Sequence, residues 1–161
     1  MPAKRQHWLI KSEPDVFSFS DLLGLPQRTT TWDGVRNYQA RNYLREMRRG
    51  DLVFFYHSST EPPGIAGIAE VAREAYADPT QFDHADEHFD ARSKPDAPTW
   101  VAVDLRGVEA LPRLVALEEL RQEPALATLQ LLQKGSRLSV QPVQEPAWRL
   151  IKALSKRKSR L

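Results

Sequence analysis

Residues 30–40 concentrate the side chains whose chemistry suits recognition of a nucleobase. Trp32 offers a stacking face, Asn37 carries an amide that both donates and accepts hydrogen bonds, and Arg36 is a permanent cation, as is the following Arg41. Stacking, edge hydrogen bonds and guanidinium contacts to phosphate are how proteins hold an unstacked base. The segment therefore predicts a contact with nucleic acid.

No comparable pattern supports catalysis or metal binding. The chain has no cysteine, no serine-centred nucleophile motif and no phosphate-cradling glycine loop. Glu13, Asp15 and Asp33 have no spacing or partner that would make a general acid and base, so we interpret them as surface charges. The His-x-Asp-x-His pattern at residues 84–88 lies in an acidic stretch without a helix signal. We therefore expect no metal and no cofactor.

Length and composition favour one ordinary globular domain. The chain has 161 residues, of which 41% are hydrophobic and 27% are charged. No apolar run approaches the roughly 20 residues that a membrane span needs, so no membrane partner is expected. The N-terminal residues show no apolar signal segment, and the lack of cysteine suits a reducing compartment. We expect an intracellular, cytoplasmic protein, or a nuclear one in a eukaryote.

The positive charge is concentrated at the C-terminus. The net charge is +2, and residues 156–161 contain Lys156, Arg157, Lys158 and Arg160 with no acidic residue. Without those four charges, residues 1–155 are at about −2. We expect residues 1–155 to form a single domain and residues 156–161 a disordered basic tail that adds contacts to phosphates.

The hydrophobic pattern predicts an α+β domain. Apolar runs with β propensity predict strands at 7–11, 52–57, 65–72, 100–108 and 138–143. Capping and periodicity signals predict helices at 21–23 (capped by Ser18 or Ser20), 38–48, 117–122, 124–133 and 146–154. Residues 77–98 are polar and predict a long loop. Short helices around these strands predict a partly closed barrel of mainly antiparallel strands.

Four separated motifs carry a resemblance to a known family. They are Trp-Leu-Ile-Lys-Ser-Glu-Pro at 8–14, the segment 30–40, the two runs at 51–58 and 63–71, and Arg-Leu-Ser-Val-Gln-Pro-Val at 137–143. In this order they resemble the EVE domain family, over about residues 8–154. The resemblance implies a PUA-like pseudo-barrel, similar in layout to the YTH domain. It also implies a partner: nucleic acid, DNA or RNA, that carries a modified base such as a methylated one.

The resemblance also implies which residues form the site. Those of the base pocket are Lys11, Ser12, Trp32, Asn37, Tyr56, His57 and Ser58. Arg36 and Arg41, with Lys11, are expected to hold the flanking backbone. The function implied is a non-catalytic reader. The alternatives are an enzyme acting on a modified base or nucleotide, and a small-molecule or protein-interaction domain that uses the same pocket.

Several of these residues also have a structural interpretation. Asn37 is in position to cap the helix that follows, and Ser12 to close a local turn. Tyr56 and His57 are adjacent on a strand and face opposite sides, so at most one enters a given pocket. Polar neighbours place Trp32 on a surface loop, which predicts that Trp32→Ala leaves the fold intact.

Overall fold

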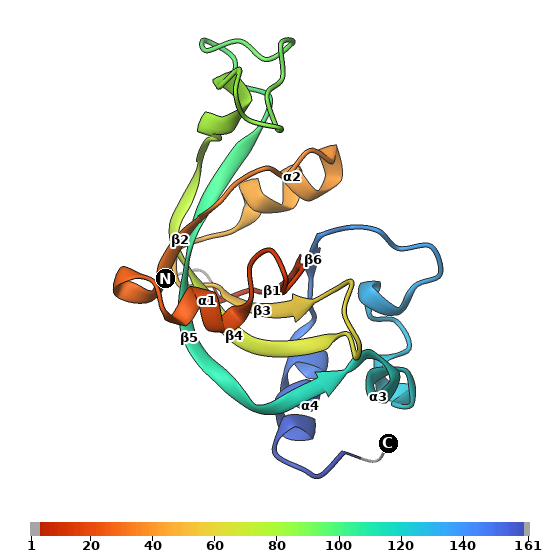
Figure 1. Ribbon diagram of the computed structural model, residues 1–161. Helices are drawn as coiled ribbons and strands as arrows, with labels where there is room; N and C mark the ends of the chain where they lie inside the picture. The colour runs from red at the N-terminus through yellow and green to blue at the C-terminus, as the bar shows by residue number, and fades with distance from the viewer. Residues whose placement is uncertain (1–3, 160–161) are drawn as a thin grey trace.

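A six-stranded sheet organises the chain in the computed structural model, which describes residues 4–159 (Figure 1). Its strands lie in the order β2-β5-β4-β3-β1-β6. They are β1 His7–Ser12, β2 Thr29–Trp32, β3 Leu52–His57, β4 Gly64–Ala77, β5 Val101–Ala116 and β6 Val140–Pro142. Strands β1 and β3 pair in parallel, and the other neighbouring pairs are antiparallel. The sheet is therefore mainly antiparallel, as the sequence predicts.

Short helices cover both faces of the sheet. The α-helices are α1 Phe19–Leu23, α2 Tyr38–Glu46, α3 Leu117–Arg121 and α4 Glu145–Ser155. Residues 4–159 also contain four 3-10 turns in the connections: η1 Pro26–Arg28 before β2, η2 Pro79–Phe82 after β4, and η3 Pro124–Leu126 and η4 Gln130–Leu132 between α3 and β6. In the described part of the chain, no helix has the length and apolar character to cross a membrane.

Strand alternation divides the buried side chains between two cores. On β3, Val53 and Phe55 enter a first core with α1 and α2, whereas Phe54 and Tyr56 enter a second core with α3 and α4. The Phe54 ring stacks on Trp148 of α4 at a centroid distance of 3.6 Å. Each face of β3 is therefore committed to a different set of neighbours.

The β4–β5 ribbon is longer than the sequence predicts. Its pairing shifts register at four places, where bulges bend and twist the strands. The ribbon continues past the sheet and carries residues 78–100 as a lobe at its far end (Figure 1). The expected strands at 65–72 and 100–108 end early because residues 73–77 of β4 and 108–114 of β5 are mostly exposed or half-buried, so the hydrophobic signal fades.

Two local expectations are corrected, and the start of the basic tail can be described. Trp32 ends the edge strand β2, which pairs with β5, and does not lie within a loop. Residues 124–133 form two 3-10 turns of three residues each and not one helix. The tail begins as an anchored turn, because Arg157 N–H donates to the carbonyl of Leu154 and the Arg113 guanidinium donates to the carbonyl of Arg157. Arg160, the last cation of the tail, lies outside the described residues.

Candidate nucleic-acid interface

Trp32 belongs to an aromatic group where three segments meet. Its ring centroid lies 5.6 Å from that of Phe55 on β3 and 6.3 Å from that of Phe17, in the turn between β1 and α1. His57 at the end of β3 lies 5.8 Å from Phe55. Trp32 and Phe17 are partly exposed and pack against the first core. We call Phe17, Trp32, Phe55 and His57 the Trp32 cluster. It presents aromatic surface on a rigid base.

His57 is held in one tautomer. Its Nε2 accepts a hydrogen bond of 3.0 Å from the backbone N–H of Phe19. Burial lowers the pKa of His57, so the ring is neutral near pH 7. A neutral ring that accepts at Nε2 carries its proton on Nδ1. His57 therefore brings a hydrogen-bond donor to the Trp32 cluster.

Ser12 lies beside His57 and organises the turn that holds Phe17. The two residues are paired in the parallel ladder of β1 and β3. The hydroxyl of Ser12 donates to the carbonyl of Phe17 at 2.6 Å, which is the local turn bond considered from the sequence. Its oxygen keeps lone pairs that a base amino group can use.

Phe17 was missed by sequence reasoning. A signal was present, because Phe17 directly precedes Ser18, the N-cap of α1. An apolar residue at that position commonly packs back on its helix as a hydrophobic staple. Its position before the cap therefore indicates a packed side chain, whereas its place beside Trp32 depends on the fold.

Lys11 and Tyr56 lie on the other face of the sheet. Tyr56 is 4% exposed and belongs to the second core, and Lys11 is its partner in the ladder. Burial raises the pKa of the Tyr56 hydroxyl and lowers that of the half-buried Lys11. The expected common pocket is therefore corrected: of Tyr56 and His57, it is His57 that faces Trp32. Ser58 follows β3 and its N–H donates to the carbonyl of Ser12 at 2.9 Å.

Asn37 caps α2. Its Oδ1 accepts a 2.9 Å hydrogen bond from the N–H of Ala40, while the residue remains exposed. The cap bond uses one of the two lone pairs of this oxygen, and the side-chain NH₂ has no partner among the described residues. At a base edge Asn37 can therefore donate through the NH₂ and accept through the remaining lone pair.

Arg36 is a structural residue, which corrects its expected contact with phosphate. Its guanidinium donates to the carbonyls of His88 and Val35, to the Asp78 carboxylate at 3.0 Å and to the Thr80 hydroxyl at 2.9 Å. Every nitrogen of the group is engaged in these bonds. Arg36 thus fastens the segment after Trp32 to the lobe formed by residues 78–100.

Asp78 and Gly34 complete this attachment. Asp78 is fully buried and accepts the Gly34 N–H at 2.8 Å. Burial acts to raise the pKa of Asp78, but hydrogen bonds from Thr80, Gly34 and Arg36 outweigh it, so its pKa lies below the usual range. Gly34 has φ of +77°, and a Cβ there would lie 2.9 Å from the His88 ring. Only glycine fits this turn without displacement.

Arg41 remains a candidate phosphate contact. Its guanidinium lies 5.0 Å from the ring centroid of Tyr38 and donates to the carbonyl of Thr99. Tyr38 is 62% exposed and stacks on Trp100 with centroids 5.0 Å apart. Arg41, the exposed Tyr38 and the buried Trp100 form one layered stack beside the segment that carries Trp32.

The residues considered for metal binding or acid–base chemistry have structural neighbours. His84 stacks on Phe89, and His88 bonds to Asp86 in a local turn. Within residues 4–159, no three His, Cys, Asp or Glu side chains are arranged to hold a metal. Burial and the nearby Asp78 raise the pKa of Asp33, although His88 opposes the shift.

The sheet, its helices and the Trp32 cluster define an α+β, PUA-like domain. The chain belongs to the EVE domain family, whose family model matches residues 6–154. The family resemblance seen in the four motifs is therefore confirmed. The fold also resembles the YTH domain of Zygosaccharomyces rouxii MRB1, with a TM-score of 0.54 at 17% identity, which is a likeness of fold alone.

Three similar proteins extend this comparison. Human thymocyte nuclear protein 1 is 41% identical over 167 residues, covering 94% of this chain and 74% of that protein. A crystal structure of human THYN1 in complex with 5-methylcytosine-containing DNA has a TM-score of 0.90 and 40% identity, covering 95% of this chain and 99% of that one. A Pseudomonas putida protein of known structure has a TM-score of 0.89 and 51% identity, covering 92% and 99%.

Proposed function

We propose that this protein is a non-catalytic reader of a modified base in nucleic acid, and that 5-methylcytosine in DNA is the first ligand to test. The observation that carries the proposal is the Trp32 cluster, because a partly exposed indole on a packed aromatic base suits stacking of a flipped base. The similarity to human THYN1, solved with 5-methylcytosine-containing DNA, supports the choice of base.

The residues on the Trp32 face supply the contacts that such a base needs. Trp32 stacks on the ring, which contributes about 1–3 kcal/mol per base. His57 Nδ1–H donates to a ring nitrogen or carbonyl, and the Ser12 oxygen accepts from an amino group. Extraction of the base from its stack costs a few kcal/mol, which these contacts offset.

The methyl group itself supplies only part of the discrimination. Burying one methyl carbon contributes about 0.8 kcal/mol, which corresponds to roughly a fourfold preference. A larger preference requires that the unmodified base, when bound, leave an empty space or a water molecule where the methyl group would lie. We therefore expect a methylated oligonucleotide to bind at least about fourfold more tightly than its unmodified match.

Titration of labelled oligonucleotides with identical sequence tests the proposal. One series carries cytosine or 5-methylcytosine and another carries adenine or N6-methyladenine, each as DNA and RNA. Equal affinity for every pair contradicts a reader. Mass spectrometry of the oligonucleotide after incubation tests the enzyme alternative, because an enzyme would convert the base chemically. The absence of any nucleic-acid binding favours a small-molecule or protein-interaction domain.

A further inference from the structure

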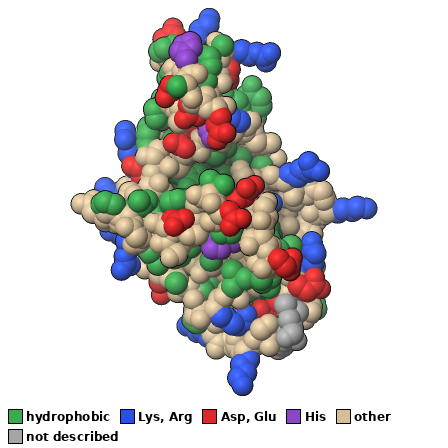
Figure 2. Space-filling model, viewed as in Figure 1, with side chains coloured by type: hydrophobic (Ala, Val, Ile, Leu, Met, Phe, Trp, Pro, Cys, Tyr) green, Lys and Arg blue, Asp and Glu red, His purple; other side chains and the backbone are tan. Residues whose placement is uncertain are grey.

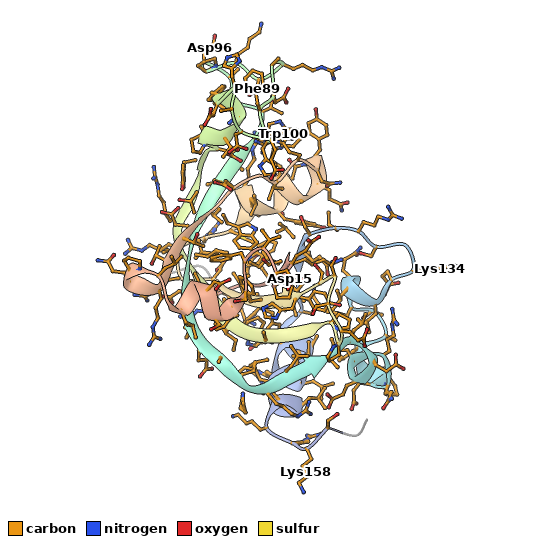
Figure 3. All side chains as sticks on the ribbon, in the orientation of Figure 1. Asp15, Phe89, Asp96, Trp100, Lys134 and Lys158 are labelled. Atoms are coloured by element: carbon orange, nitrogen blue, oxygen red, sulfur yellow. The ribbon has the colours of Figure 1, made fainter. Side chains whose placement is uncertain are left out.

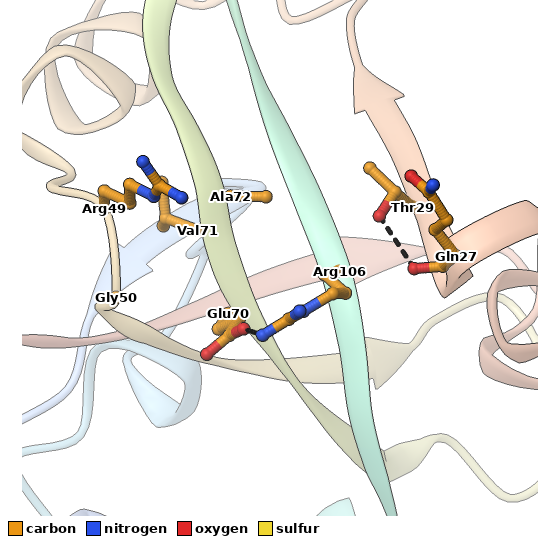
Figure 4. Close-up of a pocket in the computed structure, with 8 residues that line it drawn as sticks. All are labelled: Gln27, Thr29, Arg49, Gly50, Glu70, Val71, Ala72 and Arg106. Carbon is orange, nitrogen blue, oxygen red and sulfur yellow. Dashed lines mark hydrogen bonds and ion pairs between the residues drawn. The ribbon is translucent and has the colours of Figure 1, made fainter.

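A polar groove lies away from the Trp32 cluster, around Arg49 and Gly50. Three adjoining cavities of about 590, 410 and 570 Å³ form it. The first shares Arg49 and Gly50 with the third, and shares Gln27, Glu70 and Arg106 with the second. Figure 4 shows the first cavity, with Arg49 and Arg106 on either side of β4. We call the three together the basic groove.

Cations dominate the basic groove. Its lining includes six basic residues, Lys4, Arg5, Arg28, Arg48, Arg49 and Arg106, and three acidic residues, Asp51, Glu70 and Glu74. The local balance is therefore positive although the whole chain carries only +2. Four of the cations have no ion-pair partner among residues 4–159, namely Arg5, Arg28, Arg48 and Arg49.

The acidic residues of the groove are already engaged. Asp51 is 3% exposed and accepts hydrogen bonds from the N–H groups of Gln6 and Arg48 and from the Trp8 indole. Glu70 pairs with Arg106, and Glu74 accepts the backbone N–H of Arg49 at 3.1 Å. The exposed guanidiniums of Arg48 and Arg49 are therefore free to meet an external anion.

The surface around the Trp32 cluster has the opposite character. The turn that holds Phe17 exposes Glu13 and Asp15. Acidic side chains occupy the centre of this face in Figure 2, and most basic ones lie at its rim. Arg36, four residues after Trp32, is fully engaged inside the protein. Beyond the candidate contact at Arg41, attraction of a phosphate backbone must therefore come from another surface.

Strand β2 connects the two sites along the edge of the sheet. Glu70 and Arg106 face away from the first core, because their neighbours Val71 and Leu105 enter it. Thr29, the first residue of β2, lines the groove, and Trp32 is its last residue. Three residues of strand span about 10 Å. A DNA strand in a duplex places one phosphate about every 3.4 Å of helix axis, so that span corresponds to about three phosphates when it is measured along the axis.

We infer that the basic groove binds the sugar–phosphate backbone next to the base held at Trp32, with Arg48 and Arg49 as the principal phosphate contacts. The inference rests on the proposed function for its ligand, a nucleic acid whose chain passes over the β2 edge. The groove recognises the charge and spacing of phosphates and does not distinguish one base from another. It contributes affinity to modified and unmodified nucleic acid alike.

The test is the salt dependence of binding by the double variant Arg48→Gln/Arg49→Gln. A matched control, Arg121→Gln/Lys134→Gln, removes the same charge from exposed residues outside the groove. Lys134 projects from the loop before β6 (Figure 3). Affinities for a methylated duplex and its unmodified match are measured by fluorescence anisotropy from 50 to 300 mM salt, and circular dichroism checks that both variants are folded.

The groove variant should reduce the slope of log affinity against log salt by about 1.8, or 0.9 for each lost phosphate contact. The methylated-to-unmodified ratio should stay unchanged, and the control should keep the wild-type slope. Equal slopes in the two variants overturn the groove assignment and leave base reading intact. If the wild type binds both duplexes equally, but its salt slope depends on Arg48 and Arg49, then base reading is overturned and the groove assignment stands. Loss of the methyl preference in the groove variant also overturns the division of roles.

Discussion

Replacement of Trp32 by leucine separates the contribution of the ring to base stacking from its contribution to packing in the protein. Trp32 packs against Phe17 and Phe55, so Trp32→Ala, which the sequence predicts to leave the fold intact, would also remove packing contacts. Replacement of a completely buried Trp by Ala lowers the free energy of unfolding by about 3–5 kcal/mol. Trp32 is only partly buried and leucine refills much of the space, so we expect Trp32→Leu to reduce the free energy of unfolding by about 1–2 kcal/mol.

The effect on binding should be larger and selective. Loss of one stacking face weakens binding by about 1–3 kcal/mol, which is about 5-fold to 140-fold. The loss should fall on the methylated oligonucleotide, because only the held base contacts the ring. Anisotropy titrations with methylated and unmodified duplexes measure it, and urea unfolding monitors stability.

Leu150→Ala provides the matched control. Leu150 is a partly buried residue of the second core, on the face away from Trp32, so its truncation should cost a similar 1–2 kcal/mol of stability. It should bind both oligonucleotides as the wild type does. If Trp32→Leu keeps wild-type affinity for the methylated duplex, or if Leu150→Ala loses the same affinity, the stacking argument is refuted.

Three further predictions follow from the cited contacts. Arg36→Ala leaves the buried Asp78 carboxylate without its cation, so urea unfolding should show a loss of about 3 kcal/mol. The salt slope of binding should not change, and a slope reduced by about one would show that Arg36 touches phosphate. His7 and His57 have lowered pKa values, so the unfolded chain binds protons more readily and stability should fall as the pH drops below about 6.5. His57→Gln should flatten the Tm profile between pH 5 and 8, and an unchanged profile would contradict the assignment. Removal of residues 156–161 should weaken binding to all oligonucleotides alike and lower the salt slope, and a changed methylated-to-unmodified ratio would mean that the tail contacts the base site.

Local patterns in the sequence determined much of this protein. The apolar runs predicted β1 and β3 to within a residue, and Asn37 predicted the start of α2 because capping depends on neighbours three residues away. The four motifs predicted the EVE family and hence the fold. Trp32 was recognised as exposed aromatic surface, although the edge strand that presents it was not.

Only the tertiary structure decided which residues share a surface. Sequence alternation showed that Tyr56 and His57 diverge, but the choice of His57 depends on which core lies on each side of β3. Arg36 resembles a free cation until the fold brings Asp78, 42 positions away, against it. The basic groove likewise gathers cations from four separate segments, at 4–5, 28, 48–49 and 106. Charge and aromatic type are properties of a residue, whereas pairing, burial and the direction of a side chain arise from contacts between distant parts of the chain.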